Sequence, residues 1–440
     1  PAAPAAPTAA PAEAAQPTAA PAQPIELTLI SPDRELDQKV VAVYVSTFNA
    51  KMEQEGKPWR VKPILGPATD TDFFTKLTVD AAAQTLPDLV DLQSSWVADL
   101  AASRAIVDLA PYISTWDERD SIYPVILDAA KINNTYYSMP GGASTFSFFY
   151  RKDVLDAAGI STDQPKTWDD FYGACDNIAT KAGIAAVCLP AATPWGGGTW
   201  QEGFRQVLMG FEGTIYDTAD NTWVVSGPNL LKALTVYETL AKNKWLTVDE
   251  LLGPNPWEPT KYQMFPAGEL ALCTGGDWQW TFDWGPEGAT PIEGLFDKVA
   301  RWQFPSEKGE PFVFVGVGGG LSISANSAHP EGAWEYLRHT AQAEVQCEAM
   351  KIHVGGPSGR KDIAEKCSFY TTAVNGKMVE ATEFFGTGKF LASYTGESKY
   401  SDGIARATEE VITLQKTPEQ AMADFAKAMK DALGDAAKEL

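Results

Sequence analysis

Histidine and cysteine are scarce in this sequence, and common motifs for metal binding and nucleophilic catalysis are missing. The 440 residues include three histidines and five cysteines. No CxxC, HExxH, GxxxxGK(S/T) or GxSxG pattern occurs. A zinc site, a phosphate-binding loop and a hydrolase nucleophile elbow are commonly marked by patterns of these kinds. We therefore expect neither a metal nor a cofactor.

The sequence also contains few positively charged residues relative to negatively charged ones. Lysine and arginine total 35, against 57 aspartates and glutamates, which gives a formal net charge of -22 at pH 7. This balance repels phosphate backbones and anionic lipid surfaces, so it argues against nucleic-acid binding. A neutral or cationic ligand suits such a composition.

Long apolar runs are absent. No stretch of about 18 apolar residues occurs, so no membrane-spanning helix is predicted. The first 24 residues contain proline, alanine, threonine, glutamate and glutamine alone. Proline at this density keeps a chain extended, and nothing in the segment can build a core. We predict a disordered linker over residues 1–24, which lacks the basic start and apolar run of a signal peptide.

What the chain does contain is a repeated alternation of strand and helix patterns. Its length exceeds what one hydrophobic core usually supports, so two lobes are expected. Residues 25–30 alternate as a strand and precede a helical pattern, and strand-like runs at 59–65 and 87–93 do the same. This order predicts an α/β fold with a largely parallel sheet.

Two glycine-rich breaks interrupt strand-like runs and predict a hinge. One lies at 140–142 before TFSFFY, and the other lies at 318–320 between VFV and LSIS. Such segments can cross between lobes and absorb a rotation, whereas two tight turns within one lobe are the alternative. The expected boundaries are an N-terminal lobe of 25–140 and 318–372 and a C-terminal lobe of 141–317 and 373–440.

The C-terminal helix has complete start and stop signals. Thr417 is a predicted N-cap, Pro418 takes the first helical position, and Gln420 completes a capping box. Gly434 supplies the stop.

The cysteines suggest an oxidising compartment. Cys175 and Cys188 are close enough in sequence to close a short loop, as are Cys347 and Cys367. We predict these two disulfides and a buried free thiol at Cys273.

Tryptophan is the outlier in composition, with 14 residues, nine of them in the middle third. Two clusters adjoin glycines: TPWGGGTWQ contains Trp195 and Trp200, and GGDWQW contains Asp277, Trp278 and Trp280. Sugar rings expose apolar C–H faces and peripheral hydroxyls, so a sugar site needs aromatic platforms with polar groups at their edges. We predict that Trp278 stacks on a sugar together with Trp195 or Trp200, while Trp280 belongs to the core.

Other functions remain open at this stage. Carboxylates are abundant, so a glycoside hydrolase with an Asp/Glu pair is one alternative. A binder of another small solute, such as a polyol phosphate, a polyamine or an iron chelate, is a second. An anionic ligand calls for clustered cations, and the candidate loops contribute Arg34 and Arg360.

Five motifs in chain order resemble the bacterial extracellular solute-binding proteins of carbohydrate ABC importers, maltodextrin-binding members included. They are PDLVDLQSSW, YYSMPGGASTFSFFYRKDVLDAAGI, PKTWDDFYGAC, FPAGELALCTGGDWQW and GGGLSISANSAHPEGAWEYL. The resemblance covers nearly the whole chain after the linker. It implies a two-lobe periplasmic-binding-protein fold, in which hinge-linked α/β lobes close on a ligand in a central cleft.

The resemblance also implies ligand-binding positions. Residues 95–96 lack the acid–base pair of the maltodextrin binders, and Ser144 replaces their carboxylate at the first crossing, so we expect different sugar contacts. Asp277 is expected to add a hydrogen bond beside the stacking Trp278. The remaining implied contacts are Asp33, Arg34, Gln93, Ser95, Trp96, Ser144 and Arg360.

The expected function is therefore binding rather than catalysis. The resemblance implies a protein, expected to be monomeric, that captures a carbohydrate outside the cytoplasmic membrane and delivers it to an ABC permease. A lipid anchor on a removed N-terminal segment would explain the linker.

Overall fold

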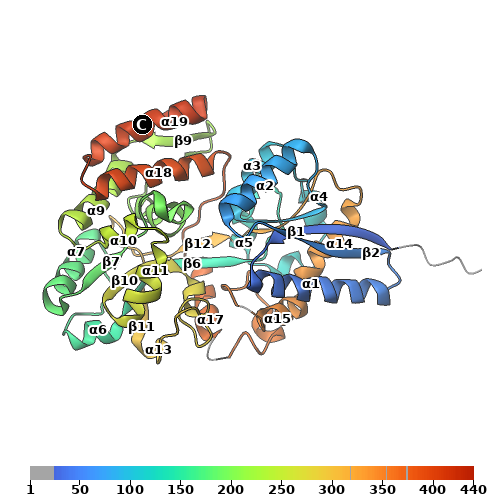
Figure 1. Ribbon diagram of the computed structural model, residues 1–440, viewed down its shortest axis with the longest axis horizontal. Helices are drawn as coiled ribbons and strands as arrows, with labels where there is room; N and C mark the ends of the chain where they lie inside the picture. The colour runs from blue at the N-terminus through green and yellow to red at the C-terminus, as the bar shows by residue number, and fades with distance from the viewer. Residues whose placement is uncertain (1–23, 318, 353, 373–374) are drawn as a thin grey trace, which may run out of the picture.

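A computed structural model describes residues 24–317, 319–352, 354–372 and 375–440 (Figure 1). The predicted linker lies, apart from Pro24, outside the described residues, as does Gly318 of the second glycine-rich break. The chain forms two α/β lobes that lie side by side, with strands β6 and β12 between them in Figure 1. The two-lobe α/β fold expected from the sequence is confirmed.

The first lobe, here the N lobe, is built on a four-stranded sheet in the order β13-β3-β1-β2. Strand β1 pairs parallel with β2 and β3, and β13 pairs antiparallel with β3. Alternate β1 side chains enter different cores: Leu29 packs on the α1 side, and Ile30 packs with α2 and α3. The elements are β1 (Ile25–Pro32), α1 (Glu35–Gln54), β2 (Trp59–Gly66), α2 (Asp70–Ala83), β3 (Leu89–Leu92), α3 (Ser94–Ala102) and β13 (Gly320–Ile323).

The second lobe, the C lobe, has a sheet in the order β11-β6-β10-β7, with β12 also paired to β6. Strand β10 runs parallel to β7 and antiparallel to β6. Helices α18 and α19 pack together and cover this lobe at its upper left in Figure 1. The main elements are β6 (Ala143–Arg151), α7 (Trp168–Asn177), β7 (Ala185–Cys188), α8 (Arg205–Gly210), α9 (Pro228–Lys242), β10 (Leu270–Gly276), β11 (Val299–Trp302), β12 (Phe314–Val317), α18 (Glu397–Ile412) and α19 (Pro418–Leu433).

Smaller elements complete the chain. Two hairpins are important below: β4 (Lys131–Ile132) with β5 (Thr135–Tyr136), and β8 (Tyr216–Asp217) with β9 (Thr222–Ser226), to which β14 (Ala437–Glu439) is added. The other helices are α4 (Ala110–Ser114), α5 (Pro124–Ala129), α6 (Lys152–Ala157), α10 (Val248–Leu252), α11 (Trp257–Pro259), α12 (Phe265–Ala267), α13 (Leu295–Lys298), α14 (Pro330–Thr340), α15 (Ala343–Met350), α16 (Ile363–Lys366) and α17 (Gly376–Thr382).

Both glycine-rich breaks lie where the chain passes from one sheet to the other. Strand β12 belongs to the C-lobe sheet, and β13, which follows it, belongs to the N-lobe sheet. The two crossing segments are adjacent, because the Met139 N–H donates to the Leu321 carbonyl at 2.9 Å. A Cβ on Gly320 would lie 2.7 Å from the Met139 carbonyl oxygen. Glycine is needed there because the backbones approach closely.

Residues 343–372 contact both lobes, although the sequence placed them in the N-terminal lobe. Ala343, Ile363 and Tyr370 belong to the hydrophobic core of the C lobe. Helix α15 also packs against α1 of the N lobe. This segment therefore forms a third connection at the lobe boundary.

One of the two predicted disulfides is present. Cys347 and Cys367 are bonded, whereas Cys175 and Cys188 are free and buried, as is Cys273. The prediction of a Cys175–Cys188 bond was wrong because Cys188 lies in β7 opposite Cys273 of β10, while Cys175 points into the core from α7. Short sequence separation did not bring the two thiols together.

Candidate functional site

The parallel strands of both lobes end toward the lobe boundary, which is where ligands bind in open α/β sheets. On the N lobe, Asp33 is exposed and Gln93 is partly exposed in the loops after β1 and β3. Arg34 is engaged by its own lobe, since Nε donates to the Ala68 carbonyl at 2.8 Å and the guanidinium pairs with Asp70. These loops form the N-lobe rim of the site.

Trp96 does not belong to that rim. It is 7% exposed, and its ring stacks on Phe74 with centroids 5.2 Å apart in the core beside α2. Ser95 lies one position earlier in α3. The helical repeat turns Trp96 toward the sheet rather than toward the C lobe.

Trp195 and Trp200 are both built into the C lobe. Trp195 packs edge-on against Trp257 at 6.4 Å, and a Cβ on Gly198 would lie 2.3 Å from its ring. Trp200 is 1% exposed, and its indole N–H donates to Glu397 at 2.9 Å. The prediction that one of these rings stacks on a sugar is not supported, because each is already covered by protein.

Trp278 is arranged differently. It follows β10 in a short 3₁₀ turn, and it stays partly exposed while Trp280 is buried, as predicted for the latter. Its ring contacts Phe146 edge-on at 5.5 Å, close to the start of β6. A Cβ on Gly276 would lie 1.9 Å from the Trp278 ring, so the glycine before the turn lets the indole fold back over the strand end.

Asp277 positions this turn rather than presenting a free carboxylate. It is fully buried and accepts hydrogen bonds from the Thr145 N–H at 2.5 Å and from Arg301 at 2.9 Å. Burial raises the pKa of Asp277, and Arg301 and Thr145 oppose that shift. The carboxylate thereby ties β6, β11 and the Trp278 turn together.

Arg360 is also structural. Its side chain is fully buried, and it pairs with Glu118 at 2.6 Å and with Asp362 at 2.8 Å. The guanidinium also donates to the Ala341 carbonyl at 2.7 Å. The adjoining residues 354–358 line the cavity described below, but the expected ligand contact of Arg360 itself is not supported, because its donors are used inside the fold.

A cavity of about 450 Å³, here the hinge cavity, lies against both crossing segments. Its walls come from α1, β3, α14, α15, residues 139–144, residues 319–321 and residues 354–358. Ser144 is the predicted ligand residue that lines it. The Trp278 turn adjoins this cavity, since the Thr281 hydroxyl donates to the carbonyl of lining residue Val354 at 2.6 Å.

The hinge cavity is acidic and rich in hydrogen-bonding groups. Asp37, Asp91 and Tyr44 line it, and the described lining residues include no lysine or arginine. Burial and the nearby Asp37 carboxylate raise the pKa of Asp91 to about 6. Burial and Asp91 raise the pKa of Tyr44 to about 12, so its hydroxyl remains a donor at neutral pH. Asp91 lies on β3, and Asp37 and Tyr44 lie on α1. No sequence motif indicated that these three residues would line a cavity.

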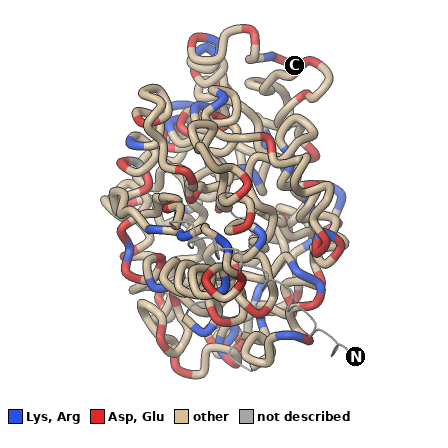
Figure 2. Tube along the Cα trace, turned by 90° about the vertical axis from the view of Figure 1, so that its right-hand side faces the viewer, with Lys and Arg blue, Asp and Glu red and all other residues tan. Residues whose placement is uncertain are grey.

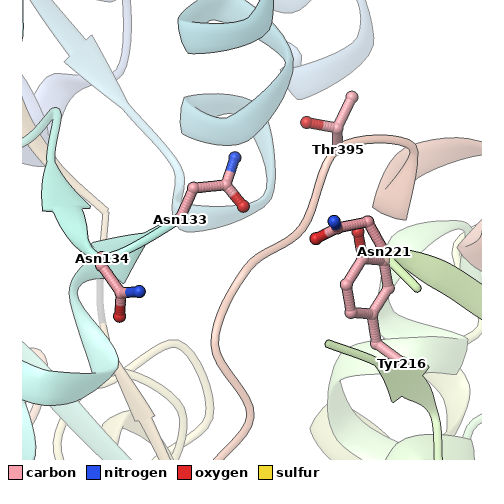
Figure 3. A pocket seen from close by; sticks show the side chains of 5 residues that line it. All are labelled: Asn133, Asn134, Tyr216, Asn221 and Thr395. Carbon is pink, nitrogen blue, oxygen red and sulfur yellow. The ribbon is translucent and has the colours of Figure 1, made fainter. Parts of the chain in front are cut away.

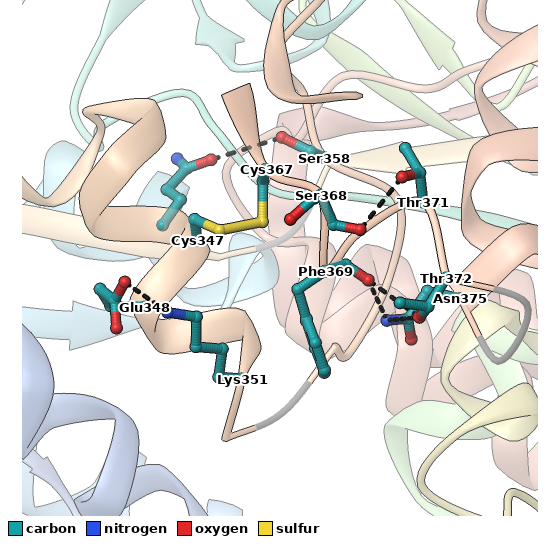
Figure 4. Close-up of a disulfide and its surroundings, with 11 residues drawn as sticks. Cys347, Glu348, Lys351, Ser358, Cys367, Ser368, Phe369, Thr371, Thr372 and Asn375 are labelled. Carbon is teal, nitrogen blue, oxygen red and sulfur yellow. Dashed lines mark hydrogen bonds and ion pairs between the residues drawn. A yellow bond between two sulfur atoms is a disulfide. The ribbon is translucent and has the colours of Figure 1, made fainter. Parts of the chain in front are cut away.

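The disulfide supports one wall of this cavity (Figure 4). Cys347 and Cys367 enclose residues 354–358, which line it. Ser358 lies beside the disulfide and donates to Gln346 at 3.3 Å, and both residues line the cavity. The cross-link therefore restricts the part of the wall formed by residues 354–358.

A buried ion pair joins two segments of the C lobe that are distant in sequence, and it packs against an aromatic ring. The Arg205 guanidinium lies 3.9 Å above the Phe314 ring, and Nη1 is 3.9 Å from Glu397. Burial lowers the pKa of Arg205 to about 10, although Glu397 opposes the shift. The two residues are far apart in sequence, and no local pattern indicated their contact.

The lobes also meet away from the hinge. Asp99 of α3 accepts from the Gly396 N–H at 3.1 Å and from the Ser398 hydroxyl at 2.9 Å. Gly396 is the N-cap of α18 and cannot cap the helix with a side chain of its own. The Asp99 carboxylate of the N lobe therefore accepts hydrogen bonds from free donors at the start of α18. Its negative charge is also favourable near the positive end of the helix dipole.

Within the described ranges, no group of histidine, cysteine, aspartate and glutamate side chains could hold a metal ion. None of the helices described is long and apolar enough to span a bilayer. On the face shown in Figure 2, basic and acidic segments are intermixed rather than gathered into a basic stripe. The candidate site therefore consists of polar and aromatic groups.

Comparisons with known proteins agree with this architecture. The chain is 22% identical to maltose-bound MalE3 of T. maritima, with a TM-score of 0.74 over 92% of this chain and 99% of that one. It is 21% identical to a solute-binding protein of Thermotoga lettingae TMO bound to alpha-D-tagatose, with a TM-score of 0.72 over 93% and 100%. At these identities the likeness establishes the fold.

Sequence relatives cover shorter stretches. An arabinooligosaccharide-binding protein of Bacillus subtilis is 28% identical over 23% of this chain, and the match spans 24% of that relative. An sn-glycerol-3-phosphate-binding periplasmic protein of Rhizobium meliloti is 23% identical over 58% of this chain and 57% of its own length. The family model described as bacterial extracellular solute-binding protein matches residues 44–375, most of the chain. The protein therefore belongs to the bacterial extracellular solute-binding protein family.

Proposed function

We propose that this protein binds a carbohydrate between its lobes and delivers it to an ABC permease without changing it chemically. The hinge cavity is the observation that carries the proposal. It is bounded by both crossing segments, and its volume of about 450 Å³ lies in the range of small-molecule sites. A ligand bound there would favour the closed arrangement by contacting both lobes.

The chemistry of the lining favours a polyhydroxyl ligand. Carboxylates accept hydrogen bonds from sugar hydroxyls, and the Tyr44 hydroxyl and Ser144 can donate. Trp278 provides an aromatic surface next to the cavity, suited to the apolar face of a sugar ring. The described lining residues include no lysine or arginine, which disfavours a polyol phosphate.

The two carboxylates also make a polyamine the second candidate. Asp37 and Asp91 would pair with ammonium groups, since no lysine or arginine of the described lining would compete for them. Isothermal titration with a sugar panel and a polyamine panel separates the two. We expect saturable binding of one sugar per protein, whereas binding of polyamines alone would reject the carbohydrate proposal.

The same titration tests the proposed absence of catalysis. After saturation, chromatography should recover the sugar unchanged, since a glycoside hydrolase would release shorter products. Release of product at a rate proportional to protein concentration would reject a pure binding role.

The remaining parts of the proposal concern assembly and location. We expect a monomer that works outside the cytoplasmic membrane, held there by a lipid on a segment upstream of the linker. Fractionation of native cells and mass spectrometry of the native N-terminus test this. Protein recovered from the cytoplasm without a lipid would contradict it.

A further inference from the structure

The hinge cavity contains a carboxylate that the protein itself does not neutralise. Asp91 lies on β3, is partly exposed and lines the cavity. The described residues give its carboxylate neither a hydrogen bond nor an ion pair, and the charges that act on it are the repelling Asp37 and the attracting Arg34. A carboxylate that is largely removed from water and has no partner costs free energy. Asp91 therefore lacks a compensating positive charge.

Arg34 does not supply this charge. Its guanidinium pairs with Asp70, and its Nε donates to the Ala68 carbonyl at 2.8 Å. Nη1 also lies 3.8 Å from Asp37, which is beyond hydrogen-bond distance. Arg34 is not among the described residues that line the cavity. Its charge is therefore engaged near the start of α2 rather than at Asp91.

A buried hydroxyl in the same cavity also lacks a partner. Tyr336 of α14 is fully buried and lines the cavity, and its hydroxyl has no hydrogen-bond partner among the described residues. Burial, followed by Tyr44 and Asp91, raises the pKa of Tyr336 well above its usual value, so the hydroxyl keeps its proton. Asp91 also raises the pKa of Tyr44, which places the carboxylate near both hydroxyls. Unpaired buried polar groups that face one cavity indicate a missing ligand.

The negative charge of the lining is confined to the N lobe. Asp37 of α1 and Asp91 of β3 supply it. The crossing segments and the disulfide-enclosed segment contribute uncharged groups instead, among them Ser144, Gln346 and Ser358. A polyamine carries an ammonium group at each end, and the second would meet no carboxylate on those walls. One ammonium group together with several hydroxyls matches the division of charge.

A second cavity at the lobe boundary provides a contrast (Figure 3). It has a volume of about 510 Å³ and lies between the β4–β5 hairpin of the N lobe and the β8–β9 hairpin of the C lobe. Its described lining includes no carboxylate and consists of Asn133, Asn134, Tyr216, Asn221 and Thr395. Carboxylates in a cavity wall are therefore a particular feature of the hinge cavity and do not follow simply from the acidic composition of the chain.

An ammonium group would complete the set of groups in the hinge cavity. It has three N–H donors and no acceptor, so it needs acceptors around it. Asp91, Asp37 and the Tyr336 oxygen are acceptors of this kind. A neutral sugar hydroxyl could donate to Asp91 but would leave its charge uncompensated. The net charge of -22 also attracts a cationic ligand from a distance.

We propose that the hinge cavity binds an amino sugar, whose ammonium group pairs with Asp91 and Asp37 while its hydroxyls bind the uncharged walls. This inference rests on the proposed carbohydrate function and specifies its substrate class. Asp91 is the residue that determines the preference for the charged sugar. The partly exposed Trp278 beside the cavity remains available for the apolar face of the ring.

The first test compares matched sugars on the unmodified full chain. Titration calorimetry at pH 7 uses glucosamine, N-acetylglucosamine and glucose, and the corresponding three forms in the galactose and mannose series. In at least one series the amino sugar should bind at least about tenfold more tightly than the neutral sugar, the scale of one charge-assisted hydrogen bond. Acetylation removes the charge and keeps the nitrogen, so the acetylated sugar should lose this advantage.

Asp91→Asn is the decisive variant, because it removes the charge and keeps the shape of the side chain. It should reduce the advantage of the amino sugar over its neutral counterpart by about tenfold. Asp431→Asn, on the exposed face of α19, is the matched control and should bind both sugars as the unmodified protein does. Thermal melting of each variant checks that the protein is folded.

The pH dependence gives a readout that a purely structural role would not change. Burial and Asp37 raise the pKa of Asp91 to about 6, so in the empty cavity its carboxylate takes up a proton between pH 7 and pH 5. The amine of the sugar stays protonated over this range. Binding of the amino sugar should therefore weaken several-fold from pH 7 to pH 5, while binding of its neutral counterpart should not.

The other titratable and charged groups that face Asp91 do not reverse this direction. They are Asp37 and Tyr44 on α1, Tyr336 on α14, and Arg34 before α1. Both tyrosines stay neutral below pH 7, because their pKa values are raised, and arginine stays charged. Burial also raises the pKa of Asp37, although Arg34 opposes the shift, so its protonation would weaken binding in the same direction.

The outcomes separate this inference from the proposed function. Equal affinities for amino and neutral sugars in every series would overturn the amino-sugar inference and leave the carbohydrate function standing. A preference that the acetylated sugar shares, or that persists in Asp91→Asn, would also overturn it. If the folded, unmodified protein binds none of these sugars, the carbohydrate proposal fails for them, and the amino-sugar inference fails with it.

Discussion

The lobes meet at the hinge cavity and at the contact between Asp99 and the start of α18, but these two regions are held together in different ways. The hinge cavity is lined by the two crossing segments, and the Cys347–Cys367 bond encloses another part of its wall. At the second region, the Gly396 N–H and the Ser398 hydroxyl donate to Asp99. Covalent continuity holds the first region together, whereas the second depends on hydrogen bonds between the lobes.

The largest effect should come from removing the Cys347–Cys367 disulfide. Cys347→Ala/Cys367→Ala should lower the free energy of unfolding by about 3 kcal/mol, the scale for a disulfide that closes a loop of this length. Urea unfolding at neutral pH measures it. Cys273→Ala is the comparison for loss of a buried thiol without a cross-link. Equal free energies of unfolding for the double variant and the unmodified protein would show that the disulfide does not stabilise the fold.

Trp278→Ala tests the aromatic surface next to the hinge cavity. It should weaken binding of the identified sugar by about 1.5–3 kcal/mol, the scale for a large apolar contact area. Trp278→Phe should restore part of the loss, because a smaller aromatic face remains. Calorimetry gives the affinities, and unchanged affinity in the alanine variant would remove Trp278 from the ligand surface.

Asp91→Asn tests the electrostatics of the hinge cavity. The pKa of Asp91 is raised to about 6, so between about pH 4 and pH 6 the folded protein binds more protons than the unfolded chain. Its contribution to stability is therefore present at low pH and is lost as the pH rises through 6. The asparagine variant should be about 2 kcal/mol more stable than the unmodified protein at pH 7 and similar to it near pH 4.

Urea unfolding at both pH values measures this difference. Asp431→Asn on the exposed face of α19 is the control, and it should follow the unmodified protein at each pH. A stability gain for Asp91→Asn that is the same at both pH values would contradict the assignment to a raised pKa.

The smallest effect should come from the contact between Asp99 and α18. Asp99→Ala should weaken sugar binding by about 1 kcal/mol, because partly exposed hydrogen bonds to a carboxylate have modest net value. Ser398→Ala removes one of the two bonds and should lose less. Small-angle scattering should show a larger radius of gyration for ligand-free Asp99→Ala. An unchanged radius and affinity would mean that this contact does not hold the lobes closed.

Local features of the fold were predictable from the sequence. Helix α19 has Thr417 as N-cap and the complete capping box with Gln420, as the sequence indicated. The alternation of strand and helix likewise predicted the parallel pairing of β1 with β2 and β3. These features depend on residues a few positions apart, whose interactions follow from the period of each element.

The candidate site was only partly predictable. The sequence identified tryptophans beside glycines, but it could not distinguish the partly exposed Trp278 from the buried Trp195 and Trp200. The Arg205–Glu397 pair and the Asp99–Gly396 contact join segments far apart in the chain and have no local pattern. Fold resemblance indicated loops that lie at the lobe boundary, but not which of their side chains are exposed there.

By itself, the sequence determined the two-lobe α/β plan, the crossing glycines and the acidic composition, because periodicity, turns and charge are properties of neighbouring residues. Tertiary structure alone decided which aromatic rings are covered, which cysteines pair and which carboxylates line a cavity. The physical reason is that burial and desolvation are set by whatever packs against a side chain, and in a chain that crosses repeatedly between two lobes those partners come from distant segments.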